Sequence, residues 1–126
     1  MYGNLDGARA IGPAVTSGTN LGDASKRFYQ AYFAVAADVS SDAKLKPDAQ
    51  DIPVEWVRAA RSVKPKRYHL TTDGPDAKWR FGYIAQDIIA AFEAEGCDVF
   101  ETNIISNGAD GMYGVNYTEF EALRDA

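Results

Sequence analysis

The sequence has little of what several common kinds of site require. Its 126 residues include one cysteine, Cys97, and one histidine, His69. A single cysteine forms no disulfide within the chain, and one histidine excludes a multi-histidine metal site. We therefore expect no metal and no cofactor, with Cys97 a small buried or half-buried residue after a helix.

Long apolar runs and excess positive charge are also missing. No stretch approaches the roughly 20 apolar residues of a membrane-spanning helix, so we expect no membrane partner. The net charge at pH 7 is -5, whereas a surface that binds nucleic acid is normally basic, so we expect no nucleic-acid partner. No phosphate-binding loop is visible, because Gly108, Gly111 and Gly114 have the wrong spacing for a dinucleotide turn.

What is present is unevenly distributed along the chain. Residues 1 to about 27 are rich in Gly, Ala, Asn, Ser and Thr and offer little from which to build a core. Residues 28–39 are rich in aromatic and aliphatic side chains, and their spacing fits a helix and a strand equally well. The aromatic and β-branched content favours a strand.

From residue 41 onward the pattern predicts a small mixed α/β domain. We expect a helix over 53–62 with Asp51 as its N-cap, and another over 84–92 that stops at Gly96. Strands are predicted at 66–72, 79–84, 99–105 and 113–117, with the first two forming a hairpin through the turn at 72–76 and a further turn at 107–111. A last helix opens at 118–121.

One short stretch, residues 41–47, carries residue types that suit peptide cleavage. Ser41 on its own is typical of a helix or turn cap. A serine nucleophile can instead use a lysine as its base, provided that burial leaves the lysine neutral. Ser41 and Lys46 are five residues apart. Neither a straight strand nor a helical turn brings such a pair together well, so a bend or a neighbouring chain is needed.

Several short motifs resemble one known family. In chain order they are Leu21-Gly22 with Ser25, Arg27 and Phe28; Ser41-Asp42 with Lys46; Lys64-Pro65 with Tyr68; Gly82 with Ile84-Ala85-Gln86-Asp87; and Tyr113 with Val115 and Tyr117. No single motif is specific, but the five occur in the correct order over about 100 residues. In this order the chain resembles the peptidase S74 family, the intramolecular chaperone domains of phage endosialidases, tail fibres and neck appendages.

The resemblance implies an α+β protein with two parts. Residues 1–40 would be the C-terminal end of a trimeric, β-rich fibre stalk, and residues 41–126 a small chaperone domain that trimerises, guides folding of the stalk and then releases itself. The mature part would belong to the virion tail, and the chaperone part would act in the host cytoplasm during assembly. The partners would be the chain's own copies in a homotrimer and the upstream stalk.

The resemblance also assigns roles within a single-turnover serine endopeptidase. Ser41 would be the nucleophile and Lys46 its general base, with the cut at Ser40, Ser41 and Asp42. Gln86 and His69 are supporting candidates that could orient or polarise the scissile peptide. Two alternatives stay open, a trimerisation and capping module that keeps the fold without the cut, and a receptor-binding fibre tip.

Overall fold

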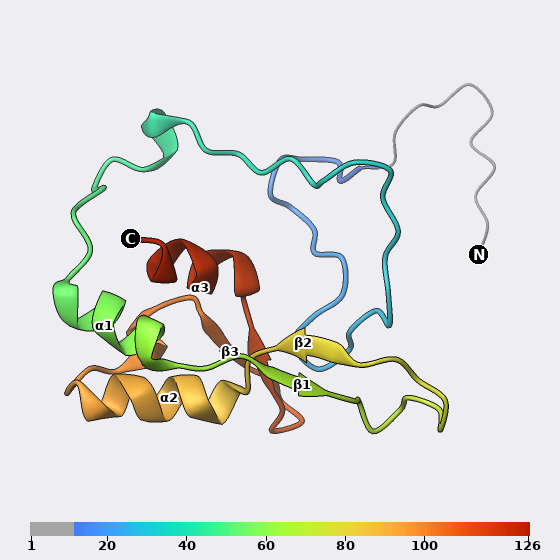
Figure 1. The fold of residues 1–126 in the computed structure, drawn as a ribbon. Coiled ribbons are helices and arrows are strands. Elements are labelled where there is room, and N and C mark those ends of the chain that lie inside the picture. Colours follow the sequence, from blue (N-terminus) through green and yellow to red (C-terminus); the bar gives the residue numbers. More distant parts are fainter. Residues whose placement is uncertain (1–11) are drawn as a thin grey trace.

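The computed structural model describes residues 12–126, and the predicted small mixed α/β domain is confirmed within them. These residues form three α-helices and two small sheets. Figure 1 shows the helices and sheets gathered in one body, with the earlier part of the chain looping outside it. The elements, in chain order, are η1 (Ala43–Leu45), α1 (Val54–Ser62), β1 (Lys66–Tyr68), β2 (Arg80–Gly82), α2 (Ala85–Ala94), η2 (Val99–Glu101), β3 (Ile105–Asn107), β4 (Tyr113–Val115) and α3 (Tyr117–Arg124), where η marks a 3-10 helix.

The helix predicted over 53–62 is confirmed as α1, but its predicted cap is wrong. Pro53 is the N-cap residue, and no side chain bonds to the first turn. Asp51 lies two residues before the N-cap, too early in the chain to take the place of a capping side chain. The helix ends before Lys64-Pro65 as expected, since the residue before proline disfavours helix.

Both sheets are antiparallel hairpins with shorter strands than predicted. β1 pairs with β2 and β3 pairs with β4, with Arg67 opposite Phe81 and Ser106 opposite Gly114. The strand predicted over 99–105 is wrong at its start, where the chain forms η2. The Asp98 carboxylate accepts the Phe100 amide at 2.9 Å, and this cap stabilises a 3-10 turn in place of extended backbone.

A single hydrophobic core joins the three helices and the second hairpin. α2 and α3 both pack against α1, and Figure 1 shows α2 beside α1. Gly96 ends α2 with a φ of +71°, as predicted, and Cys97 after it is half-buried. The core residues are Ala59, Ala60, Val63, Ala85, Ile88, Phe92, Val99, Ile104, Ile105, Phe120 and Leu123.

Two arginines fasten α3 to α1. The Arg124 guanidinium donates to the carbonyl oxygens of Ala60 and Val63 at 2.7 and 2.6 Å. Arg61 donates in return to the carbonyl oxygens of Arg124, at 2.9 Å, and Ala126. Carbonyls in the last turn of a helix lack partners within it, so these bonds satisfy both helix ends and fix the C-terminal segment on the body.

The part of the chain before α1 has a different character. No residue from 12 to 53 is buried, and the segment follows a wide path outside the helices and strands in Figure 1. The strand predicted over 28–39 does not form in the single chain. A strand is stabilised by hydrogen bonds to a neighbouring strand, and these residues pair with no other part of the described chain. The intertwined stalk therefore stays a prediction.

Candidate functional site

A tight turn brings Ser41 and Lys46 together. Asp42 caps η1 by accepting the Lys44 amide at 2.8 Å, and its carbonyl accepts the Leu45 amide at 2.9 Å. The Lys46 amide then bonds to the Ala43 carbonyl at 3.1 Å, so the chain doubles back over five residues. As a result the Lys46 Nζ atom donates to Ser41 Oγ at 2.7 Å. Of the two possibilities that the spacing left open, a bend or a neighbouring chain, the 3-10 helix supplies the bend.

Whether Lys46 carries its extra proton decides what this pair can do. An ammonium group donates to the serine oxygen and has no lone pair with which to accept the serine proton. A neutral amine in the same place would accept that proton and leave a nucleophilic oxygen. The geometry of a serine and lysine pair is therefore present, and its chemistry depends on what removes the lysine proton.

The surroundings of the pair are open. Residues 40–50 are all exposed, including both Ser41 and Lys46. The hydrogen bonds of residues 41–49 all run within this segment, and Figure 1 shows it as a loop away from the core. The Lys44 Nζ atom lies 4.0 Å from an Asp42 carboxylate oxygen and makes no hydrogen bond to Ser41. The peptide between Ser40 and Ser41 is thus accessible.

The two supporting candidates lie elsewhere in the fold. His69 follows β1, where its Nε2 atom is 3.1 Å from the Ala77 carbonyl oxygen and its ring stacks on Trp79 at 4.0 Å. Gln86 is exposed in the first turn of α2 and lines an apolar groove with Tyr68 and Tyr117. Within the described chain, neither side chain bonds to Ser41 or Lys46. These contacts of His69 lie within its own hairpin loop, and its supporting role stays a prediction.

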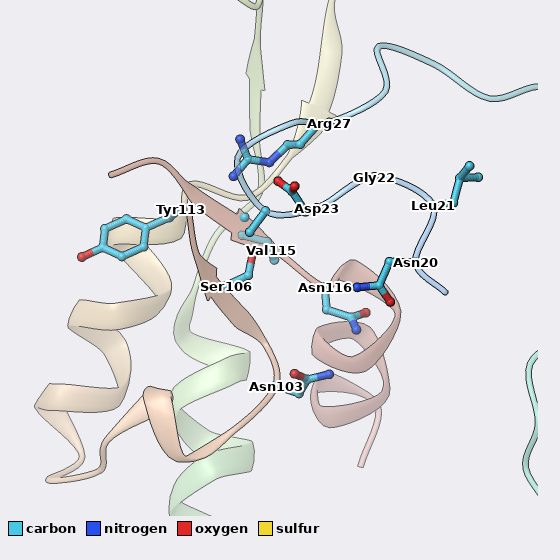
Figure 2. Close-up of a pocket in the computed structure, with 12 residues that line it drawn as sticks. Asn20, Leu21, Gly22, Asp23, Arg27, Asn103, Ser106, Tyr113, Val115 and Asn116 are labelled. Carbon is cyan, nitrogen blue, oxygen red and sulfur yellow. The ribbon is translucent and has the colours of Figure 1, made fainter. Parts of the chain in front are cut away.

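A second candidate region, which sequence reasoning did not anticipate, lies where residues 20–27 meet the β3–β4 hairpin. The two segments enclose an open groove of about 790 Å³, with Asn20, Asp23 and Arg27 on one side and Ser106 and Asn116 on the other (Figure 2). The available signals were local ones. Asp23 followed by Ser25 and Lys26 is typical of a side-chain-capped turn, and Asn107-Gly108 of a hairpin tip. Neither signal indicates that the turn and the tip touch.

The described residues contain neither a metal cluster nor a membrane-spanning helix. In residues 12–126 no group of three His, Cys, Asp or Glu side chains is placed to hold a metal ion. In the same residues no helix is long and apolar enough to cross a membrane.

The chain is similar to one protein family and to proteins of bacteriophages. Residues 41–97 match the model of the peptidase S74 family, described as the chaperone of endosialidase, and the match begins at Ser41. The chain is 36% identical to the tail spike protein of an Escherichia phage over 118 residues, which are 92% of this chain and 14% of that protein. It is 27% identical to depolymerase 1, capsule K3-specific, of Klebsiella phage KP32 over 115 residues, 88% of this chain and 13% of that one. The chain thus spans about a seventh of the length of these curated relatives.

Two solved structures share the fold. A structure described as a novel intramolecular chaperone superposes with a TM-score of 0.58 at 24% identity, over 68% of this chain and 92% of its own. The carboxy-terminal domain of the bacteriophage T5 L-shaped tail fibre, solved with its intramolecular chaperone domain, superposes with a TM-score of 0.78 at 18% identity, over 92% of this chain and 35% of its own. The motif order, the family match from Ser41 onward and the tail-protein relatives agree: residues 41–97 of this chain are a peptidase S74 segment, the chaperone of endosialidase.

Proposed function

We propose that residues 41–126 assemble three copies of a phage tail fibre or tailspike, guide folding of its stalk, and then cut themselves away between Ser40 and Ser41. The observation that carries the proposal is the 2.7 Å hydrogen bond between Lys46 Nζ and Ser41 Oγ, at the residue where the family match begins. Residues 1–40 are then the end of the mature stalk.

The cut follows from attack by Ser41 on the peptide carbonyl that precedes it. Neutral Lys46 accepts the Ser41 hydroxyl proton, and Oγ bonds to the carbonyl carbon of Ser40. Lys46 returns the proton to the departing Ser41 nitrogen as the carbon–nitrogen bond breaks, which leaves an ester between Ser40 and Ser41 Oγ. Water hydrolyses this ester, giving a carboxylate on Ser40 and restoring the Ser41 hydroxyl.

Assembly into a trimer would bury Lys46, which is exposed in the single chain. An amine acts as a base only when it is neutral, and burial favours the neutral form. Residues 40–50 are exposed in one chain, so the cover over Lys46 comes from neighbouring chains once three copies pack together. Cutting is thereby tied to completed assembly, which prevents loss of the chaperone before it has acted.

The exposed apolar side chains before the cut support trimerisation. Tyr32, Phe33 and Val35 are each more than 70% exposed, which is costly in water unless other chains cover them. The similarity to the T5 tail fibre extends over 92% of the chain, more than residues 41–126 supply, so it includes part of residues 1–40. Sedimentation at micromolar concentration should give a homotrimer, and a stable monomer would remove the basis for the stalk.

Intact-mass analysis of dyad variants tests the cut. Ser41→Ala and Lys46→Ala should each abolish cutting while the trimer stays folded, because the two side chains act as one unit. Lys46→Arg should fail as well, since a guanidinium keeps its proton. Wild type should release a fragment that begins at Ser41, faster as the pH rises, because only the neutral amine accepts a proton.

The matched control is Lys44→Ala, which removes a lysine two residues away and should cut like wild type. If Lys46→Ala cuts at the wild-type rate, or if wild type never cuts, the protease assignment is wrong. A folded trimer that never cuts would then be a trimerisation and capping module. Binding of the intact chain to host glycans or cells, lost on removing residues 41–126, would instead indicate a receptor-binding fibre tip.

A further inference from the structure

Residues 20–27, here called the docking turn, form a structured turn before the cut. The Asp23 carboxylate accepts the amides of Ser25 and Lys26 at 2.8 and 2.7 Å, and the bond from Lys26 and then that from Ser25 lower the pKa of Asp23. The Asp23 amide donates to the Lys26 carbonyl at 3.1 Å. Gly22 has a φ of +77°, a backbone conformation that residues other than glycine rarely adopt. The turn is therefore shaped by its own residues.

The docking turn contacts the tip of the β3–β4 hairpin through three polar interactions. The Ala109 amide donates to Ser25 Oγ at 2.7 Å. Arg27 donates to the Met112 carbonyl at 3.4 Å and lies 3.6 Å from the Asp110 carboxylate. These contacts join positions more than 80 residues apart, so they are tertiary contacts and not part of a local turn.

Gly108 allows the close approach of the two segments. A side-chain carbon at this position would lie 2.6 Å from the Ala24 carbonyl oxygen, which is nearer than real contacts permit. The hairpin tip presents backbone amides and carbonyls, and glycine lets the docking turn reach them. The two segments meet through complementary hydrogen-bonding and charged groups.

The contact crosses the cut. The docking turn lies on the mature side of Ser41, and the hairpin tip lies on the chaperone side. We propose that the docking turn is the surface by which the chaperone domain holds the end of the mature stalk, and that this hold outlasts the peptide bond. The second part rests on the proposed self-cleavage.

The contact between the docking turn and the hairpin tip is weak, as a temporary attachment requires. The Arg27 and Asp110 side chains are 42% and 39% exposed, and exposed ion pairs are weak and screened by salt. One contact is therefore readily reversible, while three copies acting together in a trimer bind more firmly than one. The chaperone stays in register until the cut is complete and then leaves without unfolding.

The first experiment measures the contact without cutting, in full-length chain carrying Ser41→Ala. Hydrogen exchange of the Ala109 amide is followed by NMR. Ser25→Ala removes its acceptor, and exchange should accelerate about fivefold to tenfold. Arg27→Ala should accelerate it less, and Lys26→Ala is the matched control because its side chain makes no hydrogen bond or ion pair with the described tip. Equal exchange in all three variants would overturn the proposal.

The second experiment follows the cut wild-type chain on a sizing column. In buffer of about 0.05 M salt the two fragments should elute together, and in about 1 M salt they should separate, because the ion pair is then screened. Arg27→Ala fragments should separate in both buffers. Separation of wild-type fragments at low salt would refute the retained hold. A wild type that never cuts would refute only the self-cleavage, since the exchange measurement decides the contact by itself.

Discussion

Apolar side chains of similar kinds occur in residues 28–53 and in residues 54–126. They are exposed to solvent in the first segment, whereas many are buried in the core of the second. In the first segment Tyr32 is 83% exposed and Val35 is 79% exposed, whereas Ile88 and Phe92 in the second are fully buried. Apolar content alone therefore does not decide whether a segment folds. The second segment has helices whose apolar faces meet one another, and the first has no such partner within the described chain.

The difference has a physical consequence for assembly. Both hairpins of 54–126 pair strands that follow one another in the sequence, and such local contacts form quickly. Strands that pair between chains must first bring distant ends together, which is slow. Under the proposed function, a domain that folds by itself and holds the ends of three chains would remove this delay, and its later release would leave a stalk that unfolds slowly.

The largest expected effect is on the core of the folded segment. Phe120 is fully buried, with its ring 4.8 Å from that of Tyr83. Phe120→Ala should lower the free energy of unfolding by about 3–5 kcal/mol because it leaves a cavity. Phe100→Ala, at a half-exposed position, is the control and should cost clearly less. Denaturant unfolding followed by circular dichroism measures both, and equal losses would contradict the assignment of the core.

A smaller loss of folding stability is expected from a substitution at Gly82, where α3 meets the first hairpin. The Tyr117 hydroxyl accepts the Tyr83 amide at 2.9 Å and occupies the space that a side chain on Gly82 would need. Gly82→Ala should therefore lower the free energy of unfolding by about 1–3 kcal/mol. Gly74→Ala meets nothing within 4 Å and is the matched control. The comparison fails if both glycine variants unfold at the same denaturant concentration.

Acid should weaken the first hairpin through Asp73. Its carboxylate accepts two bonds from Arg80, at 3.0 and 3.1 Å, and the Leu70 amide, and these hold the pKa of Asp73 below the ordinary 3.8. A lowered pKa stabilises the fold above pH 3.8, and this stability is lost as the pH falls through the folded-state value. Asp73→Asn should lower Tm at neutral pH and show a shallower loss in acid. A constant Tm difference between the two proteins from pH 7 to about pH 2 would contradict this role.

The smallest effect on folding is expected in the exposed segment. Phe33 is 71% exposed, so Phe33→Ala should change the unfolding of the monomeric chain by no more than about 0.5 kcal/mol. The same change should weaken trimer formation, because the apolar surface that other chains would cover is then gone. Sedimentation across a dilution series separates the two effects. A trimer of unchanged affinity would show that Phe33 lies outside the interface.

The amino-acid sequence by itself determined the local elements and the family. Hydrophobic spacing, Pro65 and Gly96 predicted α1 and α2, and turn residues predicted both hairpins, because these signals act between neighbours in the chain. Motif order indicated the peptidase S74 family. The spacing of Ser41 and Lys46 predicted either a bend or a neighbouring chain between them, and η1 provides a bend.

The tertiary structure decided what depends on residues far apart. Gly82 is needed because Tyr117, from α3, fills its side-chain space, and Gly108 because Ala24 lies against it. The docking turn and the hairpin tip are each recognisable in the sequence, but their contact is not. It arises only when the folded body places β3 and β4 beside a turn more than 80 residues earlier, since long-range contacts follow from packing and not from any local pattern.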